Sequence, residues 1–558
     1  MIRIAIVADP HFHDVYGDYD FTGPVNSRSG RPAAVRTLED TVKSTRIFNE
    51  SYFALPVALD DIATRGIRHV VIAGDYSDDG QLTTVAGVLR LLRAYRDRHG
   101  LAFHLTVGNH DVNKPFGHHQ SKDFLNPDGS RTQVTSDPAA VESGSAVVTE
   151  KMHGLGYDET VATLAEFGFR RRAEDLHWET PFGTDPTERA FEVVSDDGSI
   201  TARVPDASYL VEPVEGLWLL AIDANVYVPQ PGEPGRFTDP TDGGWDALVR
   251  HKPRLLDWIR DVTRRAEAQG KHLVAFSHYP VADYTHGMAA DLDALLGPSP
   301  FTRRNPDPAT SEAVLAAGLT LHFSGHLHVN ATGTHRSGDR ELVNVAVPSL
   351  AAYPAAYKIV TIGPDGVAIE TVAVDDVPRF DELFEHYRQE LRREGGDFGA
   401  FLDAGGYRGF LREHLTQLVR HRHLPNEWPD FIRALSRDLT LADLVVLAFA
   451  EDVEPADAPA RLRALRCGPD AAVAAAESHM KAAGVSLSEA GALPFEAAIV
   501  DWFRVRNAGA LAFRDLAPER IALYRAFIDG YPPGMRRSGL QASLAIVARL
   551  LAKALAVR

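Results

Sequence analysis

The sequence predicts an α/β fold: a four-layer αββα sandwich of two packed mixed sheets, followed by an all-α C-terminal domain. Up to residue 376, apolar segments of strand length alternate with helical patterns, as in parallel strands joined by helical crossovers. The strands are numerous enough that two sheets flanked by helices fit better than one sheet. Beyond residue 376 the strand patterns stop, and apolar residues recur at helical spacing.

Apolar periodicity and turn residues set the bounds of the predicted elements. The first strand lies within Met1–Ala8, and the other predicted strands are His69–Ala73, Phe103–Val107, Leu217–Ile222, His272–Ser277, Leu319–Phe323, Glu341–Val347, Tyr357–Ile362 and Val367–Val374. The predicted helices are Thr37–Thr64, with a kink or break at Pro56, and then Thr84–Arg98, Trp245–Ala268 and Ser311–Ala317.

We expect two domains, over residues 1–376 and 377–558, and the sequence does not indicate the role of the second. The periodicity weakens over 113–208, which predicts an insertion with one or two short helices, one of them near Asp158–Glu174. The segment Asp14–Arg36 shows no period and follows directly after a strand end. This segment is either a lid over a site or an ordinary surface loop.

The composition describes a globular protein, with 45% hydrophobic and 24% charged residues among 558. A formal net charge of -18 argues against a protein that coats nucleic acid, which would need many Lys and Arg side chains. Cys467 is the only cysteine, so intrachain disulfides and thiolate metal sites are excluded. No apolar run approaches the ~20 residues of a membrane span. Met1 leads directly into a strand without a signal-like segment, so we expect a cytoplasmic protein with no membrane partner.

Polar residues follow the predicted strands at their C-terminal ends, where open α/β sheets bind ligands. They are Asp9 and His11 after the first strand, Asp75 after the second, Asn109 and His110 after the third, and then His278, His326 and His328. A single Asp or His at a strand end commonly caps a turn. Together, however, these carboxylates, amide and imidazoles form a donor set that suits Mn, Fe, Zn or Mg.

Five short motifs carry a resemblance to a known family. In order, Asp9-Pro10-His11, Gly74-Asp75, Gly108-Asn109-His110-Asp111, His278 and Gly325-His326-Leu327-His328 match D-x-H, G-D, G-N-H-D, a lone H and G-H-x-H. Over residues 1–375 the chain thus resembles the calcineurin-like metallophosphoesterases. Its LLAIDAN, GGW (Gly243–Trp245) and HYP segments look most like the class III cyclic-nucleotide phosphodiesterase branch. That branch often has two adjacent histidines where this chain has Ser277-His278, so the substrate class stays open.

The resemblance implies a pair of metal ions and assigns their ligands. One ion would bind Asp9, His11 and His328, the other would bind Asn109, His278 and His326, and Asp75 would bridge the two. The ions would be divalent or trivalent, as Mn2+, Fe2+/Fe3+ or Zn2+, with Mg2+ less expected. Between ions ~3.5–4 Å apart, a bridging hydroxide would attack the phosphoryl group in line.

The resemblance also places candidate catalytic residues beside the ligands. His110 follows a ligand and is positioned to donate a proton to the leaving oxygen or to stabilise developing charge. Asp111 either orients His110 or caps the turn. Of Asp78 and Asp79, which follow Asp75, at least one is expected to cap the next helix.

Three further residues are candidate substrate contacts. Asp223 and Asn225 lie at a fourth strand end, with turn stabilisation as the alternative role. His118, next to His119, begins the insertion, and the alternative for this pair is a solvated surface.

The expected function is that of a dimetal phosphoesterase, which hydrolyses a phosphodiester or a phosphomonoester of small size. The alternative within this chemistry is a phosphomonoesterase or pyrophosphatase acting on a small nucleotide or sugar phosphate. A non-catalytic protein-binding scaffold would show substituted ligand positions, and here all are filled. A nuclease would need a basic groove or stacking aromatics, and the negative net charge argues against a basic groove. The Ala- and Leu-rich stretch Gln541–Val557 packs on the body or on a second copy, so a homo-oligomer is also open.

Overall fold

The computed structural model describes residues 1–143, 146–185, 188–364, 366–396, 398–467, 470–534 and 537–556. Within these ranges the chain forms two compact units. The first comprises Met1–Tyr284 and Arg304–His414, and the second comprises Thr285–Arg303 and Leu415–Arg558. The units therefore part after His414, whereas strand patterns stop near residue 376; the domain boundary at 376 stays a prediction.

The first sheet of the first unit has the order β17-β16-β1-β2-β3. Its strands are β1 (Ile2–Val7), β2 (His69–Ala73), β3 (Ala102–Thr106), β16 (Ala356–Gly363) and β17 (Gly366–Ala373). The strands β1, β2 and β3 are parallel, while β16 runs antiparallel to β1 and β17 antiparallel to β16. The parallel strands therefore share one C-terminal edge.

The second sheet has the order β14-β15-β13-β12-β11-β10-β7. Its strands are β7 (His177–Glu179), β10 (Tyr209–Val214), β11 (Leu217–Ile222), β12 (His272–Ser277), β13 (Leu321–Ser324), β14 (Ala331–Ser337) and β15 (Arg340–Ala346). The neighbours β11, β12, β13 and β15 pair in parallel, and the outer strands are antiparallel. Both sheets are therefore mixed, as predicted.

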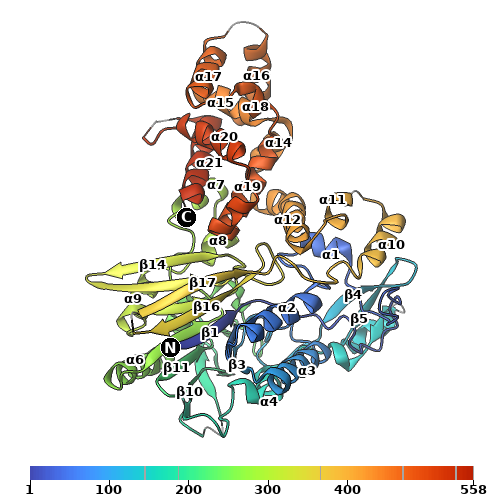
Figure 1. Cartoon of the computed structure of the whole chain (residues 1–558), viewed down its shortest axis with the longest axis vertical. Helices are drawn as coiled ribbons and strands as arrows, with labels where there is room; N and C mark the ends of the chain where they lie inside the picture. The colour runs from blue at the N-terminus through green and yellow to red at the C-terminus, as the bar shows by residue number, and fades with distance from the viewer. Residues whose placement is uncertain are drawn as a thin grey trace. The chain divides into compact units, whose positions relative to one another are not determined.

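The two sheets face each other and bury a common core. Thr106 Oγ1 on β3 donates a hydrogen bond to Ile222 O on β11 at 3.2 Å, and Tyr209 on β10 donates to Leu105 O at 2.8 Å. The helices α2 and α3 lie on one side of the sheets, with α6 and α9 on the other (Figure 1). The predicted four-layer arrangement is confirmed.

The helices of the first unit differ from the prediction at two breaks. They are α1 (Leu38–Lys43), α2 (Ser51–Thr64), α3 (Leu82–His99), α4 (Tyr157–Thr163), α5 (Gly244–His251), α6 (Pro253–Ala268), α9 (Pro308–Ala316), α10 (Phe384–Glu394) and α11 (Gly399–Leu402), and α12 (Tyr407–Leu418) follows them. Pro56 lies inside α2, and the break comes earlier, over residues 44–50. The single helix predicted over Trp245–Ala268 is wrong, because Pro253 starts a new helix and disfavours a helical Lys252.

The insertion over 113–208 contains more strands than predicted. The strands β4 (Ser121–Leu125), β5 (Arg131–Thr135) and β6 (Val147–Val148) form a small sheet, and β8 (Ala190–Val194) pairs with β9 (Thr201–Pro205). Only α4 and short 3-10 turns occupy the region where one longer helix was expected. These strands are short and polar, so their sequence has no clear apolar period.

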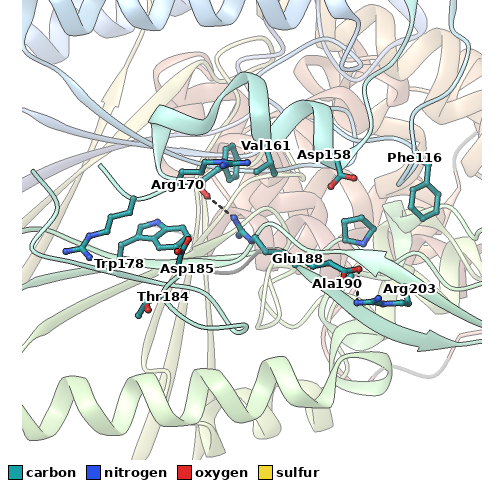
Figure 2. Close-up of a pocket in the computed structure, with 14 residues that line it drawn as sticks. Phe116, Asp158, Val161, Arg170, Trp178, Thr184, Asp185, Glu188, Ala190 and Arg203 are labelled. Carbon is teal, nitrogen blue, oxygen red and sulfur yellow. Dashed lines mark hydrogen bonds and ion pairs between the residues drawn. The ribbon is translucent and has the colours of Figure 1, made fainter. Parts of the chain in front are cut away.

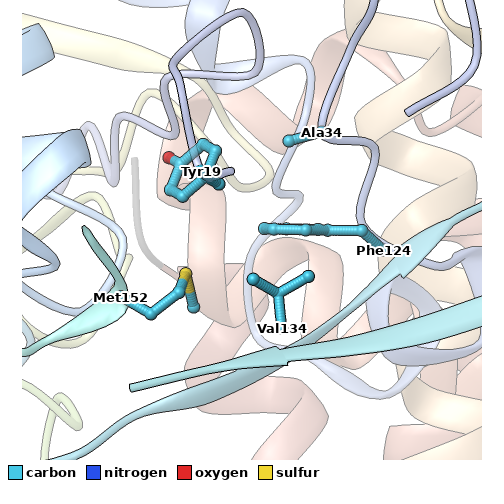
Figure 3. Close-up of a cluster of buried hydrophobic side chains, with 5 residues drawn as sticks. All are labelled: Tyr19, Ala34, Phe124, Val134 and Met152. Atoms are coloured by element: carbon cyan, nitrogen blue, oxygen red, sulfur yellow. The ribbon is translucent and has the colours of Figure 1, made fainter. Parts of the chain in front are cut away.

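A small buried cluster ties the loop 14–36 to the β4–β5 hairpin. Figure 3 shows Phe124 next to Tyr19 and Ala34 of the loop and Val134 of β5, with Met152 beside them. The Tyr19 and Phe124 rings are 5.3 Å apart between centroids. Burying such side chains stabilises the contact by about 1.5–3 kcal/mol each. Part of this loop is therefore fixed in place, and its role as a lid stays a prediction.

The second unit is helical throughout the residues that the structure describes there. Its helices are α7 (Ala289–Leu296), α8 (Pro300–Arg303), α13 (Leu424–Glu427), α14 (Asp430–Asp438), α15 (Leu441–Phe449), α16 (Ala458–Arg466), α17 (Ala471–Ala482), α18 (Leu487–Gly491), α19 (Phe495–Ala508), α20 (Pro518–Asp529) and α21 (Gly539–Ala556). The all-α character predicted for the C-terminal region is confirmed.

One helix, α21, corrects the expectation that no segment is apolar and long enough to span a membrane. By length and composition alone it could do so. A core helix of a globular protein passes the same test, and 44% of α21 is buried. It buries Leu544 and Leu551, and Arg549 and Lys553 both form ion pairs with Asp291 of α7.

Candidate metal centre

Seven predicted metal ligands converge where parallel strands of the two sheets end. They follow β1, β2 and β3 of the first sheet and β12 and β13 of the second, and all seven are buried: Asp9, His11, Asp75, Asn109, His278, His326 and His328. The packing of the two sheets brings these strand ends together. Side chains separated by about three hundred residues in sequence therefore become neighbours.

The first group comprises Asp9, His11 and His328, and one ligand atom from each lies within 4.8 Å of the others. His328 Nδ1 donates to Thr45 O at 3.2 Å, so the lone pair of its Nε2 faces the site. This Nε2 atom lies 2.9 Å from His11 Nε2 and 3.4 Å from Asp9 Oδ1. The facing imidazole nitrogens create a position that suits a cation.

The second group is organised around His278. Its Nδ1 donates to Ala73 O at 3.1 Å, which leaves Nε2 with a lone pair when the ring is neutral. Nε2 faces Asn109 Oδ1 at 3.1 Å and Asp75 Oδ2 at 3.2 Å. Three electron-rich atoms in this arrangement need a proton or a cation among them. The His326 ring lies 5.0 Å from that of His278, and its buried Nε2 has no hydrogen-bond partner among the described residues.

Asp75 lies between the two groups. Its Oδ2 atom is 3.7 Å from His11 Nε2 and 3.2 Å from His278 Nε2. A carboxylate that bridges two metal ions needs this position, within reach of ligands on both sides.

The charges of the site favour cations. Burial lowers the pKa of His278, but the Asp75 carboxylate, followed by Asp9, outweighs burial and raises the pKa to about 9. These carboxylates therefore favour a positive charge at the ring, which a metal ion would supply in place of the proton. Burial lowers the pKa values of His11 and His326, so these rings stay neutral, as metal ligands must be. The donor set therefore fits two metal ions of the kind that imidazole and carboxylate bind.

Strained backbone accompanies the ligands. Asp9, His11, Asp75, His326 and His328 all have positive φ angles, between 42° and 71°. Non-glycine residues rarely adopt this region, and each costs of order ~1–3 kcal/mol. Such strain clusters at functional sites, where the surrounding structure holds it.

Two motif glycines are required by close approach. A Cβ atom at Gly108 would lie 2.1 Å from Asp75 Oδ1, and one at Gly74 would lie 2.5 Å from His278 Nδ1. Gly74 also has a φ of +83°. Any side chain at either position would displace a metal ligand, which explains these glycines of the G-D and G-N-H-D motifs.

His110 lies at the partly exposed edge of the site. Its backbone N–H donates to Asp75 Oδ1 at 2.8 Å, and its ring centroid is 5.2 Å from that of His11. The side chain is 27% exposed, unlike the buried ligands. Its Nδ1 atom pairs with the carboxylate of Asp79, and Arg46 Nη1 lies 3.4 Å from its Nε2.

The orienting role expected for Asp111 is wrong. The Asp111 carboxylate accepts hydrogen bonds from the backbone N–H groups of Ser77 and Gly108, both at 2.9 Å, and from the Ser77 hydroxyl. It therefore holds the turn, and the carboxylate beside the His110 ring is that of Asp79. The helix cap expected from Asp78 or Asp79 is also wrong, because Gln81 is the N-cap of α3.

A cluster of ion pairs surrounds His110, and we name it the rim cluster: Arg36, Arg46, Asp78, Asp79 and Lys122. Arg46 donates to Asp78 Oδ1 through Nε at 3.2 Å and Nη2 at 2.8 Å. Arg36 pairs with the other Asp78 oxygen at 3.0 Å, and Lys122 of β4 pairs with Asp79. Arg46 and Lys122 were not predicted as site residues, because neither lies in a motif or at the end of a parallel strand. The helix break near Arg46 is the only signal that could have indicated it.

A family model described as calcineurin-like phosphoesterase matches residues 2–193. Over these residues the chain is similar to the calcineurin-like phosphoesterases. The matched residues include Asp9, His11, Asp75, Asn109 and His110, and the structure brings the three later histidines of the phosphoesterase site to them. The family and the buried Asp/His cluster support a metal-dependent phosphoester hydrolase. The phosphodiesterase branch suggested by the sequence is not confirmed.

Two solved structures are similar to this chain. A dimetal phosphatase from Danio rerio is 13% identical, with a TM-score of 0.33, and the match covers 67% of this chain and 96% of that one. GAP50, the anchor in the inner membrane complex of Plasmodium, is 9% identical, with a TM-score of 0.28 and coverage of 67% and 84%. These TM-scores are too low to bear on function. A comparison with curated proteins finds no match.

Asp223 and Asn225 lie under the phosphoesterase site and are fully buried. Asp223 accepts hydrogen bonds from the backbone N–H groups of Ala207 and Asn225, at 3.0 and 3.1 Å. The Asn225 amide donates to Gly108 O at 3.2 Å. These hydrogen bonds hold the turn, and a contact of either residue with substrate stays a prediction.

His118 lies outside the group of ligands. It packs beside Gly154, where an added Cβ would be 2.7 Å from its ring. Burial, followed by Lys114, lowers its pKa to about 4, against the opposing charge of Asp79. The charge of Asp79, a member of the rim cluster, therefore acts on the His118 ring. The contact of His118 with substrate stays a prediction.

A separate cavity of about 610 Å³ lies beside α4 and the β8–β9 hairpin. Figure 2 shows Trp178, Arg170 and Arg203 on its wall, with Arg203 paired to Glu188. None of the seven described ligands lines this cavity. This cavity and the metal centre are therefore different places.

Proposed function

We propose that this chain hydrolyses a phosphoric ester at a two-metal centre. The observation that most strongly supports this proposal is the position of Asp75 Oδ2, between His11 on one side and His278 on the other. When bound, two cations there would neutralise the phosphoryl oxygens and supply a water-derived nucleophile at neutral pH. The seven ligands hold this geometry, and the sheets exclude water from its buried side.

His110 would act on the leaving group. The Asp79 carboxylate holds the ring through Nδ1, so Nε2 is the atom that carries a proton to the departing oxygen. The partial exposure of the ring allows a substrate to reach it.

Arg46 would bind a phosphoryl oxygen beside His110. Its Nε and Nη2 atoms are used by Asp78, whereas the only partner described for Nη1 is the His110 ring at 3.4 Å. A guanidinium group binds phosphate oxygens well, because it is planar and always charged. Nη1 therefore offers donors on the side from which a substrate would enter.

Between ester types, we propose a phosphodiester first, on the sequence resemblance to the cyclic-nucleotide branch. A phosphomonoester, such as a small nucleotide or sugar phosphate, is the second candidate. The rim cluster contains three cations and two carboxylates. Its excess of positive charge favours a monoester, since a monoester dianion carries more charge than a diester. For the metals we propose Mn, Fe or Zn ahead of Mg, because four of the seven ligands are imidazoles.

A hydrolysis panel tests the proposal. The purified full chain would be offered cyclic nucleotides, linear diesters, monoesters and pyrophosphates, each with Mn2+, Fe2+, Zn2+ or Mg2+ after removal of bound metal. We expect metal-dependent turnover of at least one ester class and loss of that turnover in Asp75→Ala. Metal-independent turnover, or no turnover with any class and metal, would contradict the proposal and favour a non-catalytic scaffold.

A further inference from the structure

The break between α5 and α6 places a buried lysine below the metal centre. Lys252 has a fully buried side chain, and its Nζ donates to Asp206 Oδ2 at 2.9 Å, to Asn225 O at 2.9 Å and to Asp223 O at 3.3 Å. Three acceptors satisfy the three donors of an ammonium group. A paired and fully bonded cation of this kind fixes the strand end that carries Asn225.

Asn225 passes this restraint to both sides of the second ligand group. Its Nδ2 donates to Gly108 O, the carbonyl that precedes the ligand Asn109, at 3.2 Å. Its Oδ1 accepts from the Tyr279 hydroxyl at 2.8 Å, and Tyr279 follows the ligand His278. One amide side chain thus fixes the backbone next to two ligands.

The other end of α5 restrains the same turn. Trp245 Nε1 donates to Ser277 Oγ at 2.9 Å, and Ser277 Oγ donates to Tyr279 O at 2.8 Å. The Tyr279 ring packs 4.6 Å from the ring of His326. At Gly244, with φ at +42°, an added Cβ would lie 3.1 Å from the Tyr279 side chain, so the GGW segment allows α5 to begin against this tyrosine.

The first ligand group has different supports. His328 is fixed by the carbonyl of Thr45, and the Asp9 carbonyl accepts from Ser349 Oγ at 2.6 Å. Neither support involves α5 or Lys252. The two groups are joined by the His326 N–H, which donates to both Asp9 carboxylate oxygens at 2.9 and 3.0 Å, but these two supports of the first group lie outside the residues that hold Asn109 and His278.

We propose that the α5 brace, formed by Trp245, Lys252, Ser277, Asn225 and Tyr279, sets the affinity of one metal position and not of the other. The position that depends on it is the one with Asn109, His278 and His326 as ligands. The brace acts by positioning these ligands, and it does not touch substrate. This inference rests on the proposed two-metal function.

Metal titration of conservative variants tests the proposal. Tyr279→Phe removes one hydroxyl, and Asn225→Ala removes both hydrogen bonds of the relay. Mn2+ binding to the metal-free full chain would be followed by calorimetry, with bound metal counted by mass spectrometry. We expect the affinity of one of the two equivalents to fall about 10–100-fold, as for other residues that support metal ligands, while that of the other changes less than about twofold.

Tyr209→Phe is the matched control. Tyr209 is also buried, and its hydroxyl donates to Leu105 O on β3 at 2.8 Å, three residues before Gly108. We expect this variant to bind both equivalents like the wild type. The double variant of Tyr279 and Asn225 should weaken one equivalent no more than Asn225→Ala alone, because both changes interrupt one path.

The outcomes separate this inference from the proposed function. If the wild type binds two equivalents and the brace variants weaken both alike, or neither, the brace proposal is wrong and the two-metal function stands. Equal weakening by Tyr209→Phe would likewise overturn it. If the wild type binds fewer than two equivalents, both proposals fail. Unfolding temperatures of the metal-free variants that match the wild type would confirm that a selective loss reflects ligand positioning.

Discussion

The buried and exposed sides of the metal centre are built from different interactions. On the buried side, the α5 brace uses hydrogen bonds among groups that are fully enclosed. On the side of His110, the rim cluster uses ion pairs: its members Arg36, Arg46 and Asp78 are buried, while the side chains of His110 and Lys122 keep 27% and 16% of their surface exposed. Buried hydrogen-bond networks fix one geometry. Charges that are partly exposed can exchange their partners for a substrate.

We therefore expect the buried side to determine metal binding and the rim cluster to determine substrate binding and turnover. A change in the brace should alter bound metal, and a change in the rim should alter turnover at constant metal. The following variants test this division, beginning with the one that should affect both sides.

Asp75→Ala should have the largest effect, since Asp75 lies between both ligand groups. We expect loss of one or both metal ions and a fall in activity greater than the ~100-fold that loss of a supporting residue costs. Metal content by mass spectrometry, measured with activity, checks this result. Full metal content in the variant would refute the bridging position.

His110→Ala should affect turnover without affecting metal. Loss of a general acid costs about 10²–10⁴-fold, and we expect this loss on esters with a basic leaving group. Activated aryl esters should lose much less, because their leaving group departs without a proton. Equal losses on the two substrate classes would count against proton donation by His110.

Arg46→Ala should have a smaller effect than His110→Ala. A hydrogen bond to a charged group contributes about 1.5–3 kcal/mol, so we expect kcat/KM to fall roughly 10- to 150-fold with both metals retained. Arg36 continues to pair with Asp78 in this variant. Arg65→Ala, which removes an exposed arginine paired with Asp61, is the control and should leave kinetics unchanged. Loss of metal in the Arg46 variant would show that the two sides are not separable.

Asp223→Asn should have the smallest effect, a change in how stability depends on pH. Burial raises the pKa of Asp223 to about 6 from 3.8, with Lys252 opposing and Asp206 adding to the rise. The folded protein therefore binds this proton more tightly than the unfolded chain. Its contribution to stability is present below pH 4 and is lost as the pH rises to about 6, by an amount on the order of 3 kcal/mol.

Denaturant unfolding of the metal-free protein between pH 4 and 8 measures this contribution. The free energy of unfolding of the wild type, relative to Asp223→Asn, should fall over pH 4–6 and then stay level. A difference that does not change with pH would show that Asp223 is ionised throughout and that the buried network is differently charged.

The strand ends could be predicted from sequence because the signal is local. An apolar run such as His69–Ala73 marks a buried strand, and the following Gly74-Asp75 marks its ligand. Parallel pairing then brings such ends together. The same reasoning predicted two mixed sheets and a helical C-terminal region.

The supporting residues could not be predicted, because their roles depend on contacts distant in sequence. Asn225 lies at the end of a predicted strand, which made it a candidate for contact with substrate. The packing of the second sheet on the first instead buries it against Gly108. Arg46 follows a short helix in no motif, and only the fold brings it to His110. Pro253 could have indicated the helix break at Lys252 that the single predicted helix missed, but the sequence does not show that the lysine is buried.

Anomalous scattering from a crystal grown with Mn2+ tests the central claim most directly. We expect two peaks ~3.5–4 Å apart, one beside Asp9, His11 and His328 and the other beside Asn109, His278 and His326, with Asp75 between them. A single peak, peaks elsewhere in the molecule, or Asp9 and His326 pointing into separate cavities would contradict the two-metal account.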